Sequence, residues 1–230
     1  MPSSLVLLPG LDGTGEQFAP LIARLGSDFA PTVVRYPNDG AVDFPAHEAA
    51  ARASLPTDQP YLLLGESFSG PLAIRLAATA PPGLGGLILC ASFARFPRPA
   101  LRFLRPFGAM ISTAMLPAWL VASFVLGGSA RRPLTDLLAR STRGTSPRAL
   151  RSRVLSVFDV DARRELALVR VPILYLRATR DRLVPASASR EIESIARRTV
   201  IVEIDAPHFV LQAAPAEAAQ FIRRFAAACA

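Results

Sequence analysis

The chain has 230 residues, 51% of them hydrophobic and 19% charged, which is typical of a globular protein and argues against a disordered one. With two cysteines and two histidines, it is a poor candidate for a disulfide framework, a CxxC site or a His-rich metal centre, and we expect no cofactor. The formal net charge is +8, and 13 of the 26 basic residues, all of them arginine, lie in residues 93–165 together with only four acidic residues.

On both sides of this basic block, short apolar runs alternate with segments of helical spacing. The first run, residues 5–8, is too short for a signal peptide, so we expect a cytoplasmic protein. Apolar runs typical of strands covered on both faces predict strands over 5–8, 32–36, 61–64, 84–89, 171–177 and 200–204. Helical spacing predicts helices over 16–25, 43–55, 67–79, 186–196 and 216–228. This alternation predicts an α/β fold with a doubly wound, mostly parallel six-stranded sheet.

The basic block interrupts the alternation. We expect residues 93–165 to be an inserted helical cap, or lid, on a core formed by residues 1–92 and 166–230. Within the block, residues 106–130 carry no charge and are long enough to span a bilayer. Pro117 interrupts this run, and a membrane span here would divide the core, so a cap over an active site is the better interpretation.

The segment that follows the third predicted strand carries the main chemical signal. It reads Gly-Glu-Ser-Phe-Ser-Gly over residues 65–70, between a buried strand and a helix, the context of a nucleophile elbow of the G-x-S-x-G type. Ser67 is therefore the candidate nucleophile, although Ser69 stands where the motif has its second glycine. Ser67 as an ordinary helix-capping residue is the alternative. Ser69 is a poor rival nucleophile because Ser67 and Pro71 would be its flanking residues.

A serine hydroxyl is a weak nucleophile and needs a base oriented by a carboxylate. His208 follows the last predicted strand, at the sheet edge where sites form in doubly wound folds, whereas we expect His47 on a solvated helix face. Asp181 follows the preceding strand, which gives the order Ser67, Asp181, His208 found in hydrolases with this elbow. Asp205 is the rival acid, but it lies only three residues before His208.

A glycine-rich loop, residues 10–15, follows the first predicted strand. A phosphate loop of the G-x-x-x-x-G-K-[ST] type is excluded because the chain contains no lysine. The loop is better interpreted as part of an oxyanion hole, which needs two preorganised N–H donors. The backbone N–H groups of Leu11 and of Phe68, the residue after the candidate nucleophile, are the expected donors.

Together, these motifs resemble the α/β-hydrolase superfamily, and in particular small bacterial serine esterase-like hydrolases with a cap. The resemblance covers most of the chain outside residues 93–165 and implies a Ser-His-Asp triad, an acyl-enzyme intermediate and no cofactor or metal. The first-loop motif of the family usually reads His-Gly-x, whereas Pro9, Gly10 and Leu11 stand here. Aspartate-dependent relatives such as haloalkane dehalogenases and epoxide hydrolases are disfavoured because Ser67 occupies the nucleophile position.

Three functional classes follow. The favoured one is a carboxylesterase acting on a small-molecule acyl ester. The alternative is an esterase, thioesterase or acyltransferase whose acyl group is held by an acidic acyl carrier protein bound at the basic cap, and the third is a non-catalytic binding module. We expect no nucleic-acid partner, and contact with a membrane surface is possible but not favoured.

The cap carries a further expectation about the pocket. We expect the charge-free run to line an acyl channel, because ligand sites are mostly apolar and concave. The arginines that flank this run would then form a positive rim able to steer an acidic partner. They are Arg95, Arg98, Arg102, Arg105, Arg131 and Arg132.

Overall fold

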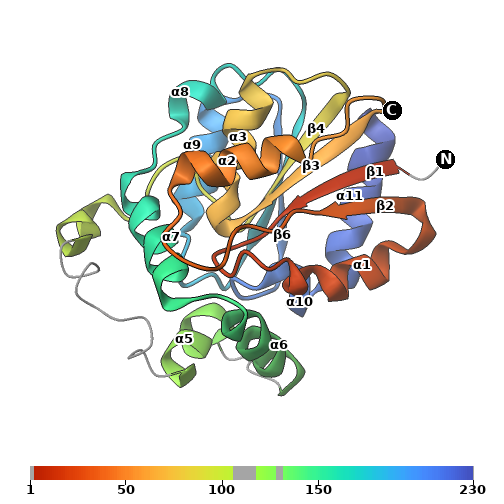
Figure 1. The fold of residues 1–230 in the computed structure, drawn as a ribbon. Coiled ribbons are helices and arrows are strands. Elements are labelled where there is room, and N and C mark those ends of the chain that lie inside the picture. Colours follow the sequence, from red (N-terminus) through yellow and green to blue (C-terminus); the bar gives the residue numbers. More distant parts are fainter. Residues whose placement is uncertain (1–2, 106–117, 128–131, 230) are drawn as a thin grey trace.

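A computed structural model describes residues 3–105, 118–127 and 132–229. Its centre is a six-stranded sheet in the order β2-β1-β3-β4-β5-β6, in which every neighbouring pair is parallel (Figure 1). The strands are β1 (Ser3–Leu8), β2 (Phe29–Val33), β3 (Tyr61–Glu66), β4 (Leu84–Cys90), β5 (Ile173–Ala178) and β6 (Thr199–Ile204). The predicted fold class and strand number are confirmed.

Helices cover both faces of the sheet, which explains why the four inner strands, β1, β3, β4 and β5, are buried along most of their length. One face packs against α1 (Ala19–Leu25), α10 (Val210–Ala213) and α11 (Pro215–Cys229). The other face packs against α2 (Phe44–Ala53), α3 (Gly70–Ala78), α8 (Arg163–Leu166) and α9 (Ala186–Ile195). Short 3-10 turns precede α1, β2 and α3, namely η1 (Glu16–Phe18), η2 (Gly26–Asp28) and η3 (Ser67–Ser69).

The second strand differs from the prediction. It begins three residues earlier, at Phe29, and includes Pro31, which pairs with Leu5 of β1. β2 lies at the edge of the sheet, so the absent N–H of Pro31 costs no hydrogen bond to a further strand. Tyr36, predicted to end this strand, lies beyond β2 and is buried.

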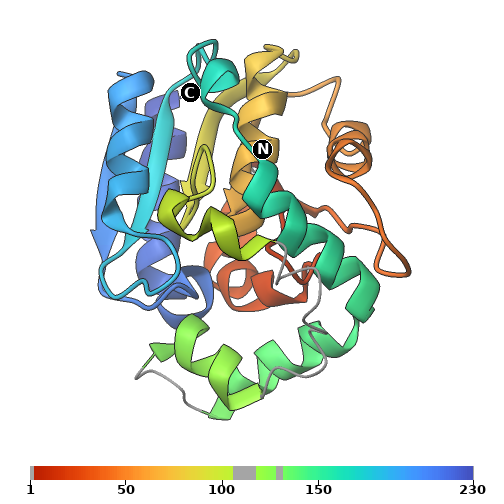
Figure 2. The same ribbon diagram turned by 90° about the vertical axis from the view of Figure 1, so that its left-hand side faces the viewer.

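Residues 93–165 hold η4 (Pro99–Leu104), α5 (Ala118–Val125), α6 (Arg132–Arg143), α7 (Pro147–Asp159) and most of α8. Figures 1 and 2 show α5, α6 and α7 gathered at the end of the sheet where the strands finish. Near the end of this segment, Ala162 is fully buried and packs in the same hydrophobic cluster as Leu166. Where the cap begins and ends stays a prediction.

The predicted acyl channel falls mainly on residues 106–117 and 128–130, which lie outside the described residues, as does Arg131 of the predicted rim. The part of the charge-free run that the structure does describe forms α5, Leu126 and Gly127. In the described ranges, no helix is both long and apolar enough to cross a membrane.

Candidate active site

The turn between β3 and α3 has the backbone geometry expected of a nucleophile elbow. Ser67 adopts φ 49°, a left-handed conformation that is strained for a residue with a Cβ atom. The turn closes tightly because Gly65 has no side chain: a Cβ there would lie 2.7 Å from Ser69 O and 2.8 Å from Ala73 Cβ. Gly70 is equally constrained, since a Cβ would overlap Ser92 Oγ. In the G-x-S-x-G motif the second glycine lets a neighbouring segment pack closely against the turn. Here Ser69 occupies that position, and Gly70 allows the close packing instead.

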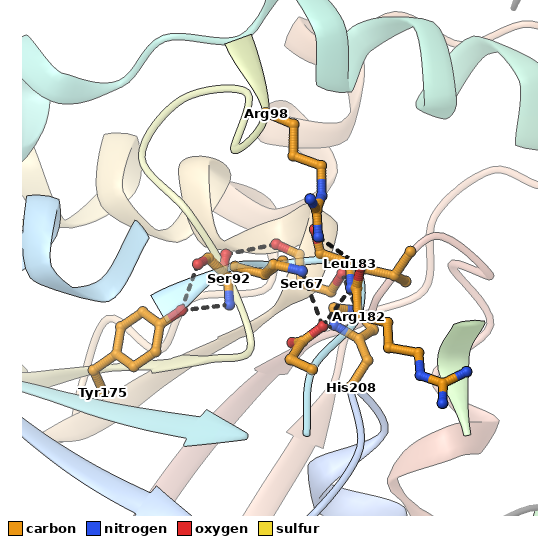
Figure 3. Close-up of polar contacts among 9 residues, drawn as sticks. Ser67, Ser92, Arg98, Tyr175, Arg182, Leu183 and His208 are labelled. Atoms are coloured by element: carbon orange, nitrogen blue, oxygen red, sulfur yellow. Dashed lines mark hydrogen bonds and ion pairs between the residues drawn. The ribbon is translucent and has the colours of Figure 1, made fainter. Parts of the chain in front are cut away.

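Two residues that the sequence analysis did not single out hold this turn from the neighbouring strands. Ser92, just beyond β4, donates its hydroxyl to Ser67 O at 2.6 Å. Tyr175 of β5 donates to Ser92 O at 2.5 Å and accepts from Ser92 N at 3.0 Å. Figure 3 shows this chain running from Tyr175 through Ser92 to Ser67. The strained turn is thus anchored to two strands.

The structure brings three of the predicted site residues together. Ser67 Oγ lies 2.8 Å from His208 Nε2, and His208 Nδ1 lies 2.8 Å from Asp181 Oδ2 (Figure 3 draws the Ser67 and His208 side chains). The His208 and Asp181 side chains are 9% and 4% exposed. Asp205, the rival acid, is 81% exposed and pairs instead with Arg180 at 2.8 Å.

The Asp181 loop is itself braced. The second carboxylate oxygen, Oδ1, accepts the backbone N–H groups of Leu183 and Val184 at 2.8 and 2.9 Å. Arg98, from the predicted cap, donates to Arg182 O at 2.8 Å and to Leu183 O at 3.2 Å (Figure 3). The carboxylate that faces His208 is therefore fixed by its own loop and by a side chain from residues 93–165.

The expected place of His47 on a solvated helix face is wrong. His47 is fully buried, with Tyr36 and Phe68 packed edge-on against its ring. Its Nδ1 lies 2.6 Å from Asp43 O, and its Nε2 accepts the Nε–H of Arg153 at 3.0 Å. Burial, with a smaller contribution from Arg153, lowers the pKa of His47. Both ring nitrogens are occupied, so His47 has none to offer Ser67 as a base.

The Ser69 hydroxyl is also buried and hydrogen-bonded within the fold. It donates to Pro9 O, and its Oγ lies 2.7 Å from the Tyr36 hydroxyl. These contacts tie the first loop to the elbow. They agree with the choice of Ser67 over Ser69 as the candidate nucleophile.

The loops that carry the two expected oxyanion donors leave the sheet side by side, because Leu8 of β1 pairs with Gly65 of β3. Leu11 lies in a turn closed by Gly13 N donating to Gly10 O at 3.1 Å. Its own N–H has no acceptor among the described residues. Phe68 lies in the 3-10 turn before α3, where the first backbone N–H groups of a helix lack intrahelical acceptors. Both N–H groups thus remain candidates for binding an oxyanion.

Glu66, the residue before the candidate nucleophile, is a buried carboxyl group that the sequence analysis did not predict. Its Oε1 accepts from Gln212 Nε2 at 2.9 Å, and its Oε2 has no partner in the described part of the chain. Burial raises the pKa of Glu66 from 4.5 to about 7. Within residues 3–105, 118–127 and 132–229, no three histidine, cysteine or acidic side chains are grouped so that they could hold a metal ion.

Comparison with known proteins gives the family. A model of the alpha/beta hydrolase family matches residues 5–221. The chain belongs to this family. This alpha/beta hydrolase is 30% identical to a pimeloyl-[acyl-carrier protein] methyl ester esterase of Xanthomonas oryzae pv. oryzae, over 80% of this chain and 79% of that protein. The esterase of the same name from Xanthomonas axonopodis pv. citri is similar to the same extent. The alpha/beta hydrolase is thus an enzyme of the carboxylic ester hydrolase type.

Solved structures agree on the fold of the alpha/beta hydrolase. A lipase-esterase related protein from Clostridium acetobutylicum superposes with a TM-score of 0.80 at 15% identity, over 97% of this chain and 94% of that one. The enol-lactonase of Burkholderia xenovorans superposes with a TM-score of 0.78 at 18% identity, over 99% and 92%. At these identities the likeness concerns the fold alone.

Proposed function

We propose that this alpha/beta hydrolase cleaves a carboxylic ester through an acyl-enzyme intermediate on Ser67. His208 takes the hydroxyl proton as Ser67 Oγ attacks the ester carbon, while the N–H groups of Leu11 and Phe68 stabilise the oxyanion. The ester C–O bond then breaks, and the alcohol leaves with the proton from His208. A water molecule, deprotonated by His208, attacks the acyl group, the acid is released, and Ser67 regains its proton. Asp181 keeps the His208 ring oriented and stabilises its protonated form.

The observation that carries this proposal is the continuous hydrogen-bonded chain from Ser67 Oγ through His208 to Asp181, with both distances at 2.8 Å. Its supporting context is the left-handed backbone of Ser67, which costs free energy and is retained at a functional turn. If Ser67 were only a helix-capping residue, it would not need hydrogen bonds that lead through His208 to Asp181.

The test combines active-site labelling with kinetics. A fluorophosphonate probe should label the wild-type protein on Ser67, and Ser67→Ala should lose both labelling and ester hydrolysis, by several orders of magnitude in kcat. Ser69→Ala is the matched comparison: it removes a neighbouring buried hydroxyl and should keep labelling on Ser67, with a lower kcat because the hydrogen bond to Pro9 O is lost. Labelling of Ser67→Ala with loss of labelling in Ser69→Ala would refute the assignment.

We further infer that residues 93–165 act as a cap beside this site. Leu126 and Leu137 of that segment pack with Phe209, the residue after His208. Arg98 contacts the Asp181 loop directly. Both contacts support a cap that encloses the reacting groups.

A second candidate substrate is an acyl ester held on an acidic carrier protein. Two observations favour it over a free ester: the related Xanthomonas esterases are named for a carrier-bound ester, and the excess positive charge of this chain lies in residues 93–165. Basic side chains near a site favour association with an acidic protein. A panel of methyl esters of increasing acyl length, offered free and carrier-bound, should give the higher kcat/KM for the carrier-bound form. If kcat/KM were equal for the free and carrier-bound esters at the same acyl length, the free ester would be the preferred interpretation.

A further inference from the structure

Arg153 of α7 is the largest fully buried side chain in the described part of the protein, although it is an arginine in the most basic part of the chain. A guanidinium group has five N–H donors, and all five are used here. The acceptors belong to three separate segments. They are Leu11 O and Asp12 O at 2.9 Å each, Pro37 O at 2.8 Å, Asn38 Oδ1 at 2.6 Å and His47 Nε2 at 3.0 Å.

These acceptors are neutral, and the Asp12 carboxyl group attracts Arg153 electrostatically without forming a direct ion pair with it. Burying a cation costs free energy of desolvation, which neutral partners only partly offset. We therefore expect a role of Arg153 other than stabilising the fold. Lysine could not replace it, because an ammonium group has three donors on a single atom. The planar guanidinium instead spans loop 10–15, the segment after β2, and helix α2.

The first loop is built around this group. Its carbonyls at Leu11 and Asp12 point at Arg153, and Asp12 O also accepts the Thr145 hydroxyl at 2.5 Å. Gly13 packs directly on the guanidinium with φ 66°, so a Cβ at this position would overlap it. The Asp12 carbonyl and the Gly13 N–H belong to one planar peptide unit, and that N–H donates to Gly10 O at 3.1 Å. Gly10 O and the Leu11 N–H point in opposite directions from another peptide unit, so holding the Asp12 carbonyl restricts the direction of the Leu11 N–H.

We propose that Arg153 is a positioning residue that fixes loop 10–15 so that the Leu11 N–H group is preorganised as an oxyanion donor. The inference rests on the proposed function, because it assigns a device to the oxyanion hole of that reaction. It gives residues 93–165 a second role besides enclosing the site: α7 supplies the group that keeps one of the two donors in place.

His47 completes the device. Its Nδ1 lies 2.6 Å from Asp43 O, which leaves Nε2 as the acceptor for Arg153 only while the ring is neutral. The other ionisable groups around it are Asp43 on its own helix, Tyr36 against the ring edge and Arg153 itself. A neutral histidine is therefore the acceptor that this position requires, and a protonated ring would face Arg153 with a second positive charge.

The test compares Arg153→Lys and Thr145→Val with Arg151→Lys, a control at an exposed position of the same helix. For Arg153→Lys on a short aryl ester we expect kcat to fall by roughly 10- to 100-fold with KM within about threefold, since misplacing an oxyanion donor costs transition-state stabilisation. Affinity for an aryl trifluoromethyl ketone, which forms a tetrahedral oxyanion adduct on the serine, should fall in parallel with kcat/KM. Thr145→Val, which keeps the side-chain shape and removes one donor to Asp12 O, should shift both in the same direction by a smaller factor.

A readout independent of activity separates this inference from the proposed function. Amide hydrogen exchange over residues 9–15, followed by mass spectrometry, should be faster in Arg153→Lys and in Thr145→Val and unchanged in Arg151→Lys. Wild-type exchange rates in both variants would overturn the positioning role even if the wild-type enzyme were inactive on every ester. With an active wild type, a loss of kcat at unchanged ketone affinity would overturn it as well. An inactive wild type with faster exchange in the variants would refute the proposed function and leave the hold of Arg153 on the loop intact.

Discussion

The Oδ2 atom of Asp181 lies 2.8 Å from Nδ1 of His208, and its Oδ1 atom is occupied by two backbone N–H groups of the same loop. Asp181→Asn should therefore lower kcat on the order of 10⁴-fold, because an amide that donates toward Nδ1 selects the wrong tautomer of the base. Thermal unfolding, measured alongside, should show that the variant remains folded.

Asp205→Asn is the matched control for this experiment. Asp205 is an exposed carboxylate that pairs with Arg180, and its replacement should change kcat by less than about threefold because exposed ion pairs contribute little. If Asp205→Asn were the more damaging substitution, the acid would be Asp205 and the loop that carries Asp181 would need another role.

The strand pattern explains why these residues could be predicted. In a parallel sheet all strands end at one edge, so the segments that follow β3, β5 and β6 had to bring Ser67, Asp181 and His208 to the same place. The prediction used the elbow motif, the strand ends and the chain order. The predicted strand boundaries were accurate to within three residues. The largest error was at the edge strand β2, because Pro31 is unfavourable in a strand and the start was therefore placed after it.

The supports of the site could not be predicted in this way, because they depend on contacts between residues that are far apart in the chain. His47 and Arg153 are 106 residues apart, and neither stands in a recognisable motif. His47 follows the helix-capping Asp43, which favoured a solvated position, while only the folded chain shows that Arg153 reaches its ring. The same holds for Ser92, which contacts Ser67 from the segment just beyond β4.

Glu66 makes the stability of the enzyme depend on pH. Burial raises its pKa to about 7 in the folded chain against an ordinary 4.5, so folding is favoured most below pH 4.5 and the contribution is lost as the pH rises through 7. Glu66→Gln removes the charge and should raise the free energy of unfolding at pH 8 by at most about 3.5 kcal/mol, since one pKa unit corresponds to about 1.4 kcal/mol.

Urea unfolding of the wild type and Glu66→Gln at pH 4.5 and pH 8 checks this prediction. The advantage of the variant should be large at pH 8 and small at pH 4.5. Glu217→Gln, at an exposed position of α11, should stay within about 0.5 kcal/mol of the wild type at both values. A Glu66→Gln variant that gains the same stability at both pH values would show that the charge of Glu66 is not the cause.

His47 predicts the opposite response, at the acid side. Burial lowers its pKa in the folded chain below the ordinary 6.5, so above pH 6.5 it is neutral in both states. As the pH falls below 6.5, the unfolded chain takes up a proton that the folded chain does not. The free energy of unfolding should therefore fall until the pH reaches the lowered pKa. His47→Gln cannot titrate and should lose less stability than the wild type between pH 8 and pH 5. The two proteins share all other titratable groups. If their free energies of unfolding changed equally between pH 8 and pH 5, the prediction would be contradicted.

The carrier-bound substrate makes a kinetic prediction about the basic cap. Arg102 and Arg132 are exposed, whereas Arg105 pairs with Asp159 at 2.6 Å and Arg98 is bound to the Asp181 loop. The first two are therefore the better candidates for steering an acidic partner. For an acyl ester on an acidic carrier protein, kcat/KM should fall steeply as salt is raised from about 0.05 to 0.5 M, because the screening length shortens from above 10 Å to well below 8 Å.

Arg102→Ser with Arg132→Ser should remove most of that salt dependence, and the loss should appear in kcat/KM and not in kcat, since steering acts on the encounter of the two proteins. The control removes the same charge elsewhere: Arg24 and Arg197 are exposed just before β2 and β6 begin, at the end of the sheet away from Ser67. Replacing both by serine should leave the salt dependence as in the wild type. For a short neutral ester, both double variants should match the wild type at every salt concentration. If the control pair reduced the salt dependence as much as Arg102 and Arg132 did, the effect would come from net charge, and the carrier would have no preferred approach over the cap.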